Sequence, residues 1–497
     1  MKFGYSMSGH KETLWENTVR FIVLAIMGAG LILAIGGNFT FANRDIFRCI
    51  LTVIGTSAFL YVFTLFARKT VDSYKVWFTM IFIAALILRI IMINTWKIAP
   101  TSDFKDTYEA ALALADADIS NLASVMRGEN SYYYASWPVH LPFILIKMAI
   151  IKVFGEDIYP IQVIFNIFSA GSCVAAAMVA KSLYGRRAGI TAGVFMCVFP
   201  LSLMYSAVLT NQHMATFFFL LSIYFIIDKP KKYKLRNVFF AGLSAAAAQL
   251  IRPEMQVYVI AVICYFLYKY IFSVRYKSLM KDAARKFASY SVMFLCVYIV
   301  AIYAVNLPIM QSGMIKESLM NTNYRYKIAT GLNRETRGAW NEKDALHSTD
   351  YDELDRRIKE RSSDFGQVLK LGTEKIAFQY GTYDYSWCIE GKSGGFVEKW
   401  YGPLTNDVML VILILALMRV ALAAFRRSRR ELFVMIIMAG YFLIFMVIEI
   451  QNRYNYFAIP IFVIFACGSM EYICDEGLGK LKKAFVNMKN GQNRAKA

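Results

Sequence analysis

The stretch Val139–Phe154, VHLPFILIKMAIIKVF, decides the topology, because the direction of every later segment depends on whether it crosses a membrane. It supplies about 15 helical residues, or about 22 Å, whereas the core of a bilayer is about 30 Å thick. It also contains Lys147 and Lys152, and a lysine near the bilayer centre costs about 2.5–3.5 kcal/mol. We therefore expect a helix that lies along the membrane interface.

The rest of the chain has the composition of a polytopic membrane protein. Hydrophobic residues make up 57% of the sequence, charged residues 18%, and the mean hydropathy is +0.43, which is unlike a soluble domain. Many apolar runs approach the length of about 20 residues that a membrane-spanning helix needs. The sequence predicts an all-α polytopic protein with about 12 transmembrane helices, at 19–38, 46–67, 76–96, 159–182, 188–206, 208–227, 237–251, 254–272, 287–306, 405–425, 431–449 and 454–473.

The distribution of positive charge supports this topology. The net charge is +20, and cytoplasmic loops of membrane proteins are rich in Lys and Arg. If the N-terminus is cytoplasmic and Val139–Phe154 does not cross, the positive charge falls on the cytoplasmic side. The basic loops are then 68–75, 181–187, 229–236, 275–286 and 426–430, followed by the Lys-rich tail. We expect both termini in the cytoplasm and no nucleic-acid partner, because no basic surface interleaved with aromatic residues occurs.

This topology defines the expected domain organisation. Two large polar segments, 97–158 and 307–404, face the extracytoplasmic side together, and the second is long enough for a small α or α+β lobe. The expected units are N-terminal extra helices at 1–75, a transmembrane core at 76–306 that includes the first external loop at 97–158, the lobe at 307–404, C-terminal helices at 405–474 and a basic cytoplasmic tail at 475–497.

Asp103 is the main candidate for catalysis. It follows a predicted span in the sequence APTSDF and begins a polar loop at the membrane face. A carboxylate that is partly withdrawn from water there can act as a general base. An ordinary helix start explains the same residues, with Ser102 or Asp103 as the cap and Asp106 and Glu109 in or near the first turn.

Two arginines lie in outer turns that are otherwise poor in positive charge. Arg252 stands in the sequence Arg-Pro-Glu, and Arg453 lies between Asn452 and Tyr454. A guanidinium group binds phosphate through two hydrogen bonds, although an arginine at a membrane edge can also simply snorkel to water. We treat both arginines, together with Lys147, as candidate phosphate-binding residues.

Further polar and aromatic residues at the predicted outer face are candidates for substrate binding. The aromatic run around Tyr134 fits either a membrane-interface belt or a cradle for a lipid or sugar. The sequence contains no CxxC motif and no Cys/His cluster, so it predicts no metal site. The candidate substrate-binding residues are Asp106, Tyr108, Tyr134, His140, Asn211, His213, Glu254 and Tyr454.

The order of these motifs resembles a known family. The sequence has a Pro-x-x-Asp loop ending at Asp103, then YYYASWPVHLPFILIKMAIIKVFG, LYGRRAG, VFPLSLMYSAVLTNQH, AQLIRPE and RYNYFAIP. This pattern is similar to bacterial GT-C membrane glycosyltransferases of the protein O-mannosyltransferase and aminoarabinose-transferase type. The likeness covers about 76–310 and 405–473.

The resemblance implies a GT-C-like helical bundle with juxtamembrane helices, in a bacterial cell membrane. It also implies a sugar donor linked to polyprenyl phosphate and an external active site. Asp103 matches the first-loop aspartate that is essential to catalysis in the family. Arg252 and Arg453 match positions that face the lipid phosphate.

Two positions depart from the family pattern. O-mannosyltransferases carry Asp-Glu where this chain has Asp103-Phe104, and their second outer turn commonly holds an acidic residue where this chain offers Asn211, Gln212 and His213. The resemblance therefore assigns neither the acceptor nor a cofactor. It allows a divalent metal, which the sequence does not support.

The function that we predict is inverting glycosyl transfer from a polyprenyl-phosphate donor to an extracytoplasmic glycan, lipid or protein. Two alternatives remain at this point. A transporter or flippase for lipid-linked glycans would need charged or broken helices near the middle of the membrane. A non-catalytic membrane assembly protein would use the outer lobe for binding alone.

Overall fold

The computed structural model describes residues 13–42, 44–69, 74–117, 137–227, 235–383, 385, 388–389, 397–425 and 428–494. Within these ranges the chain is almost entirely helical, with one isolated bridge between Ala339 and Ile450 and no longer strand. The predicted all-α class is confirmed. The helices outside the lobe are α1 (Leu14–Phe41), α2 (Ile46–Lys69), α3 (Tyr74–Thr95), α4 (Asp103–Asp116), η2 (Pro138–His140), α7 (Leu141–Phe154), α8 (Ile158–Tyr184), α9 (Arg186–Val198), α10 (Pro200–Tyr205), α11 (Gln212–Ile227), α12 (Leu235–Ile251), α13 (Met255–Leu267), η3 (Tyr268–Phe272), α14 (Lys277–Gln311), η5 (Val397–Tyr401), α19 (Gly402–Phe425), α20 (Arg429–Phe445), η6 (Asn452–Asn455) and α21 (Ala458–Arg494).

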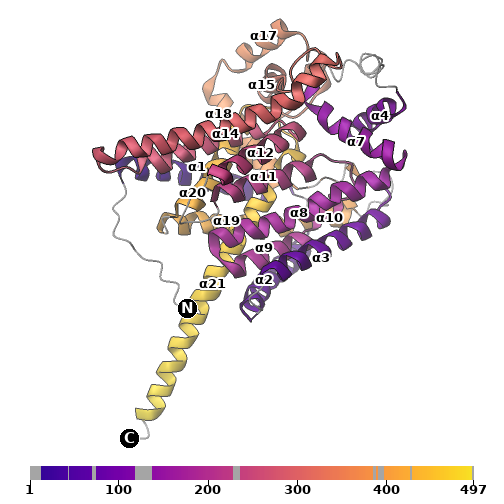
Figure 1. Ribbon diagram of the computed structural model, residues 1–497. Helices are drawn as coiled ribbons and strands as arrows, with labels where there is room; N and C mark the ends of the chain where they lie inside the picture. Colours follow the sequence, from indigo (N-terminus) through magenta and orange to yellow (C-terminus); the bar gives the residue numbers. More distant parts are fainter. Residues whose placement is uncertain are drawn as a thin grey trace.

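Helix α1 connects two chemically different ends of the bundle. At its start, Thr13 Oγ1 donates to the carbonyl of Phe272, and Glu16 pairs with Arg429 at 2.5 Å. At its end, Asn38 Nδ2 donates to the carbonyl of Gly381 at 2.7 Å. We call the first the basic end and the second the lobe end. The lobe itself projects beyond the second (Figure 1).

The predicted spans alternate in direction between these two ends. Eight of the described helical segments are long and apolar enough to cross a membrane: α1, α2, α3, α8, α13 with η3, α14, η5 with α19, and α21. The other four predicted spans correspond to shorter helices, namely α9 with α10, α11, α12 and α20. Helix α21 starts at the lobe end, and its Glu471 bonds Arg187 at the basic end, at 2.8 Å. The N-terminal end of the first span and the C-terminal end of the last span therefore both lie at the basic end of the bundle.

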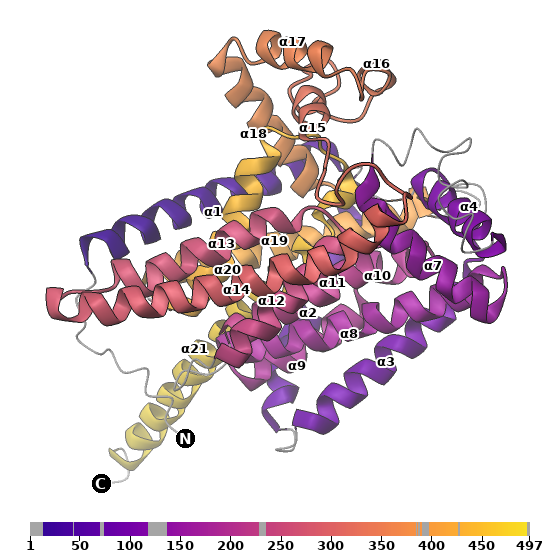
Figure 2. The same ribbon diagram turned by 45° about the horizontal axis from the view of Figure 1, so that its top comes forward.

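Helix α7 is the segment on which the topology depends. It has 14 residues, begins after Pro138, and is not among the candidate spans of the described chain. It packs against α4, and the two helices lie to one side of the bundle (Figure 2). Helix α8 follows it and ends at the basic end, where Tyr184 donates to Glu431 at 2.9 Å. Helix α8 thus runs toward the basic end, which fits the sequence prediction that α7 does not cross the membrane.

The lobe is a small helical unit. It contains α15 (Tyr324–Gly331), α16 (Glu342–Ala345), α17 (Tyr351–Arg361) and α18 (Phe365–Gly381). The charged helix α17 is held to α16 through the buried Asp344, which accepts from Arg357 at 2.5 Å and from Arg361 at 3.0 Å. Helix α18 lies against α1 and joins the lobe to the bundle.

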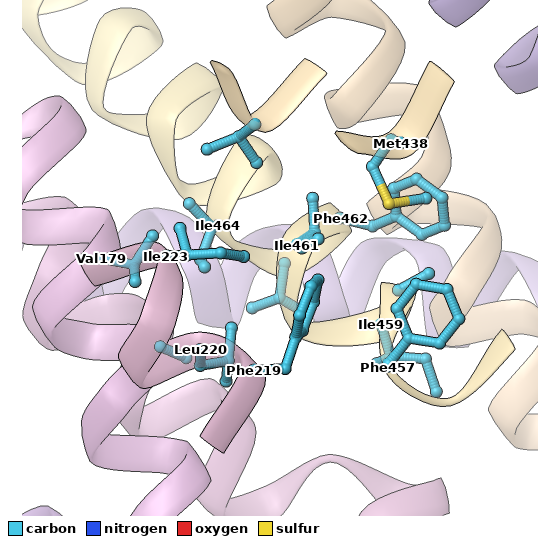
Figure 3. Packing of buried hydrophobic residues seen from close by; sticks show 14 of the residues in the cluster. Val179, Phe219, Leu220, Ile223, Met438, Phe457, Ile459, Ile461, Phe462 and Ile464 are labelled. Carbon is cyan, nitrogen blue, oxygen red and sulfur yellow. The ribbon is translucent and has the colours of Figure 1, made fainter. Parts of the chain in front are cut away.

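Apolar packing between α11, α20 and α21 holds in place the segment of chain around Arg453, which carries part of the candidate site. Figure 3 shows Phe219 and Ile223 of α11 facing Ile461 and Ile464 of α21. Phe457 packs between Phe219, with ring centroids 5.6 Å apart, and Tyr441, at 4.1 Å. Dispersion contacts of this density hold helices together in a membrane, where burial from water contributes little. They anchor Phe457 only a few residues after Arg453.

The contact between α1 and α18 generates a stability prediction. A Cβ atom at Gly37 would lie 1.8 Å from the carbonyl oxygen of Ala377, whereas one at the exposed Gly36 would meet nothing within 4 Å. We expect Gly37→Ala to lower the free energy of unfolding by at least about 1–3 kcal/mol, because the two helices must separate. Gly36→Ala is the matched control and should be neutral or slightly stabilising. Thermal unfolding in detergent measures both, and equal midpoints for the two variants would contradict this packing.

Candidate active site

Asp103 begins α4 in an unusual backbone setting. The preceding residue, Ser102, has φ +50° and ψ −143°, a conformation that L-residues rarely adopt, and its side chain forms no cap hydrogen bond. The expected capping by Ser102 is therefore not observed. Strain of this kind costs about 1–3 kcal/mol and is commonly found at functional sites. The N-terminal dipole of α4 favours the ionised form of Asp103.

Asp103 forms an ion pair with Arg453, a residue 350 positions away in the chain. Arg453 Nη2 donates to Asp103 Oδ2, and the Asp103 side chain stays 38% exposed. Burial favours the neutral acid, but the Arg453 guanidinium outweighs it and lowers the pKa of Asp103 to about 2. Asp103 is therefore ionised at neutral pH, and it is a weak base as long as this pair persists.

Arg252 has a comparable set of partners. Its Nε lies 3.0 Å from both carboxylate oxygens of Glu254, and its Nη1 donates to Asn211 Oδ1 at 2.8 Å. Burial opposes ionisation of Glu254, but Arg252 lowers its pKa overall. Three of the predicted site residues thus form one hydrogen-bonded group.

Tyr454 brings the cationic groups together. The guanidinium of Arg252 lies 5.5 Å from the centroid of its ring, and that of Arg453 lies 5.9 Å away. A third cation, Lys327 of α15, lies 5.4 Å from the same centroid and donates to Tyr454 Oη at 3.2 Å. Three positive groups therefore surround one aromatic ring next to Asp103.

The sequence did not single out Lys327 or its partner Glu449 as site residues. Lys327 Nζ lies 2.6 Å from Glu449 Oε2, and the Glu449 side chain is fully buried. The clue available in the sequence was the acidic Glu449 at the outer end of the predicted span 431–449, since a buried carboxylate requires a cation or a hydrogen-bond donor.

His140 belongs to the same electrostatic group. Burial lowers the pKa of its imidazole to about 4; Asp103 opposes this shift, and Arg252, Arg453 and Lys327 add to it. His140 is therefore neutral at pH 7, and each of the three cations faces a carboxylate.

Lys147 and Tyr108 make contacts among α4, α7 and the segment before α8. Lys147 Nζ donates to Thr107 Oγ1 at 2.8 Å, and burial lowers its pKa to about 7. Tyr108 donates to the carbonyl of Glu156. These contacts hold α4 against α7 and the start of α8, so the phosphate role of Lys147 stays a prediction.

The remaining candidates have different surroundings. Asp106 lies three residues along α4, and burial followed by the Asp103 charge raises its pKa. His213 lies deeper, with Nδ1 3.1 Å from Tyr456 Oη and Nε2 3.2 Å from the carbonyl of Tyr205. Tyr134 lies outside the described residues. Their roles as substrate contacts also stay predictions.

The groups around Asp103 suit an anion. No cluster of three or more His, Cys, Asp or Glu side chains able to hold a metal ion occurs in the described part of the chain. The carboxylate of Asp103 is paired with a guanidinium, and the other nearby carboxylates also face cations. Guanidinium and ammonium groups form strong hydrogen bonds to phosphate oxygens, so a phosphate could compete with these carboxylates for the three cations.

Two apolar cavities, both open to the surface of the bundle, lie along α8 and α11. One, of about 380 Å³, is lined by α7, α8 and α11 and includes Met214, the neighbour of His213. The other, of about 500 Å³, is lined by α3, α8 and α11. Phe168 lines both cavities, so they adjoin one another along α8.

Comparisons with known proteins show similarity to one family in part of the sequence. Residues 138–306 match the family model described as dolichyl-phosphate-mannose-protein mannosyltransferase. No curated protein sequence matches the chain.

Solved structures with a similar fold are membrane glycosyltransferases. The Archaeoglobus fulgidus oligosaccharyltransferase tethered to an acceptor peptide has a TM-score of 0.50 at 10% identity, and the match covers 81% of this chain and 50% of that one. The oligosaccharyltransferase AglB from the same organism, with an inhibitory peptide and a dolichol-phosphate, gives 0.47 at 11% identity, covering 84% and 52%. ArnT from Cupriavidus metallidurans, bound to undecaprenyl phosphate, gives 0.36 at 10% identity, covering 80% and 78%.

These likenesses concern the fold, and the chain spans about half the length of the oligosaccharyltransferase structures that it matches. The family match and the shared fold confirm the resemblance to GT-C membrane glycosyltransferases. The chain thus has the apolar helices of a multi-pass membrane protein, and its fold is similar to that of the oligosaccharyltransferase.

The Asp103–Arg453 pair generates a prediction about protonation. In Arg453→Met the burial of Asp103 persists without its cation, so its pKa should rise from about 2 to above the ordinary 3.8. Carbodiimide modification of Asp103, which requires the protonated acid, should become detectable near pH 5 in the variant and stay absent in the wild type. Mass spectrometry of the modified peptide measures it.

The same pair makes a contribution to folding stability that depends on pH. Because the folded-state pKa of Asp103 is depressed, the stabilising effect of the pair is present above about pH 4 and is lost as the pH falls through about 2.

Equal carbodiimide labelling of wild type and Arg453→Met across pH 4–6 would show that Arg453 does not control the protonation of Asp103.

Proposed function

We propose that this protein is an inverting glycosyltransferase that moves a sugar from a polyprenyl-phosphate donor to an extracytoplasmic acceptor. The observation that carries the proposal is the position of Asp103 beside three cations that share the Tyr454 ring. A carboxylate next to a phosphate-binding group is what a displacement at a phosphate-linked anomeric carbon requires. The matched family, whose description contains a dolichyl-phosphate-linked sugar, supports the same class of donor.

The proposed reaction is a single displacement. A hydroxyl or amine of the acceptor attacks the anomeric carbon while its proton passes to Asp103. The bond between the anomeric carbon and the phosphate oxygen breaks, and its electron pair leaves with polyprenyl phosphate. Attack from the face opposite the phosphate inverts the anomeric configuration. Arg252 and Arg453 stabilise the negative charge that grows on the leaving phosphate.

The ion pair between Asp103 and Arg453 suggests how the base becomes active. A pKa of about 2 makes Asp103 a poor proton acceptor. A donor phosphate competes for the Arg453 guanidinium, and as that contact moves to the phosphate, the pKa of Asp103 rises. Donor binding therefore converts a masked carboxylate into a competent base at the moment when an acceptor can be used.

The apolar cavities provide a place for the isoprenoid chain of the donor. They are lined by apolar side chains of α3, α7, α8 and α11, and the first begins beside Met214, directly after His213. Such a surface offers dispersion contacts to a hydrocarbon chain. The sugar and phosphate would then lie at Asp103, with the chain running along this apolar surface of the bundle.

Sidedness follows from the charge distribution. The basic end carries Arg187, Arg429 and Arg430, and we assign it to the cytoplasm, together with both termini. The lobe end is then extracytoplasmic, in a bacterial cell membrane. Exposed aromatic residues of the lobe, including Tyr324, Trp340 and Tyr351, offer a binding surface to a glycan, lipid or protein acceptor.

The alternatives have less support. A transporter would use charged groups near the middle of the membrane. The three candidates all have defined partners: Arg89 of α3 donates to Ser169 Oγ at 2.7 Å, Arg419 is paired with Glu431, and Glu449, after the end of α20, is paired with Lys327. An assembly protein has no need of a carboxylate and three cations gathered around one ring. No described contact specifically favours either role.

The central test is removal of the carboxylate. Asp103→Asn should reduce sugar transfer by about 10²–10⁴-fold, because the proton acceptor is lost. The exposed Glu109, which pairs only with Lys105 at 3.5 Å, provides the matched control Glu109→Gln, which should keep full activity. The assay is release of undecaprenyl phosphate from synthetic undecaprenyl-phosphate mannose, and from donors with other sugars, in membranes that contain the natural acceptors. Full transfer by Asp103→Asn would remove the assignment.

A further inference from the structure

Lys327 is the one cation at the site that comes from the lobe. It lies in α15, its Nζ reaches Glu449 Oε2 at 2.6 Å, and it donates to Tyr454 Oη at 3.2 Å. Its ammonium group also lies 4.6 Å from the ring of Trp137, at the end of the first external loop. The lobe therefore contributes directly to the group of residues around Asp103.

A chain of polar contacts links Lys327 to Arg453. Glu449 Oε1 accepts from Gln451 Nε2 at 2.8 Å, and Gln451 Oε1 accepts from Arg453 Nε at 2.7 Å. Burial disfavours the charged ammonium, but Glu449 outweighs it and raises the pKa of Lys327. Lys327 therefore carries its full charge at neutral pH, although only 24% of its side chain is exposed.

The position of α15 does not require the Lys327 ammonium. The backbone N–H of Glu449 donates to the Lys327 carbonyl at 2.7 Å, and that of Ile450 donates to the Gly338 carbonyl at 2.9 Å. The buried Lys375 adds three bonds, to the carbonyls of Gly331 at 2.8 Å, Met446 at 3.2 Å and Ile448 at 2.7 Å. Backbone pairing and Lys375 already join the lobe to this loop, so Lys327 is not the sole tie between them. Its ammonium group neutralises the buried Glu449 and remains partly exposed.

The charge balance points to the same conclusion. Arg252, Arg453 and Lys327 each face one carboxylate, and His140 is neutral at pH 7. The leaving group of the proposed reaction carries close to two negative charges as a phosphate monoester. Even when Arg453 moves from Asp103 to the phosphate, Arg252 stays paired with Glu254, so the two guanidinium groups neutralise the leaving group only in part. Lys327, although it is shared with Glu449, adds a third cation at the Tyr454 ring.

We propose that Lys327 is a phosphate-binding residue of the active site, supplied by the lobe, and that Glu449 holds its ammonium group in place. This inference rests on the proposed function, because it requires a phosphate-linked lipid at Asp103. It makes the lobe part of the donor site as well as a surface for the acceptor. The lobe must then be docked before the leaving phosphate can be fully stabilised.

The test is lipid binding to the full-length protein in nanodiscs, with undecaprenyl phosphate and uncharged undecaprenol as probes. Lys327→Met should weaken the binding of undecaprenyl phosphate by roughly 10- to 100-fold, because a charged hydrogen bond is lost. It should leave undecaprenol binding unchanged, which damage to the lobe would not. Lys327→Arg should restore most of the phosphate affinity. Lys370→Met, at an exposed lysine of α18, is the matched control and should bind both lipids as the wild type does.

The outcomes separate this inference from the proposed function. If Arg453→Met weakens phosphate binding and Lys327→Met does not, the function stands and the role of Lys327 is wrong. If Lys327→Met weakens both lipids equally, its role is structural and the inference is also overturned. If the wild type binds undecaprenyl phosphate no better than undecaprenol, the proposed donor site fails, and this inference fails with it.

Discussion

The ion pair between Asp103 and Arg453 is the contact on which the rest of the site depends. It joins the first residue of α4 to η6 across 350 positions of sequence, and it exists only because several packing layers bring these segments together. Helix α7 supports α4 through Lys147 and Thr107, and Phe457 anchors the end of η6 between α11 and α20. The pair also keeps Asp103 ionised and unreactive toward protons. A contact that silences the base is useful only if a ligand can displace it, and an anionic phosphate is the chemical group suited to do so.

The architecture separates two electrostatic environments. At the basic end, ion pairs such as Arg187–Glu471 and Arg419–Glu431 tie helices to one another, and these are pairs with defined structural partners. At the lobe end, the pairs converge from four separate segments on a single ring, that of Tyr454. Buried ion pairs contribute little net stability, because the loss of hydration offsets their attraction. The proposed phosphate binding gives a reason for their concentration around Asp103 that folding stability does not supply.

The sequence predicted the helices more completely than the contacts that bring the site residues together. The apolar runs gave the helices and their alternating directions, and the short, lysine-bearing stretch Val139–Phe154 gave an α7 that fits the topology. Asp103 could be chosen because it begins a polar loop at the membrane face, and Arg252 and Arg453 because outer turns are otherwise poor in positive charge. Their convergence on Tyr454 could not be foreseen, because it depends on how η6 folds back against α4. Lys327 was missed because a lysine in a polar lobe has no distinguishing pattern, and only the buried Glu449 marks it out.

The most direct measurement of the central claim is the structure of the protein in nanodiscs with bound undecaprenyl phosphate, determined by electron cryomicroscopy. The account predicts the phosphate in contact with Arg252, Arg453 and Lys327, with the Arg453 guanidinium moved away from Asp103 toward the phosphate. A phosphate bound elsewhere, with the Asp103–Arg453 pair intact, would contradict it.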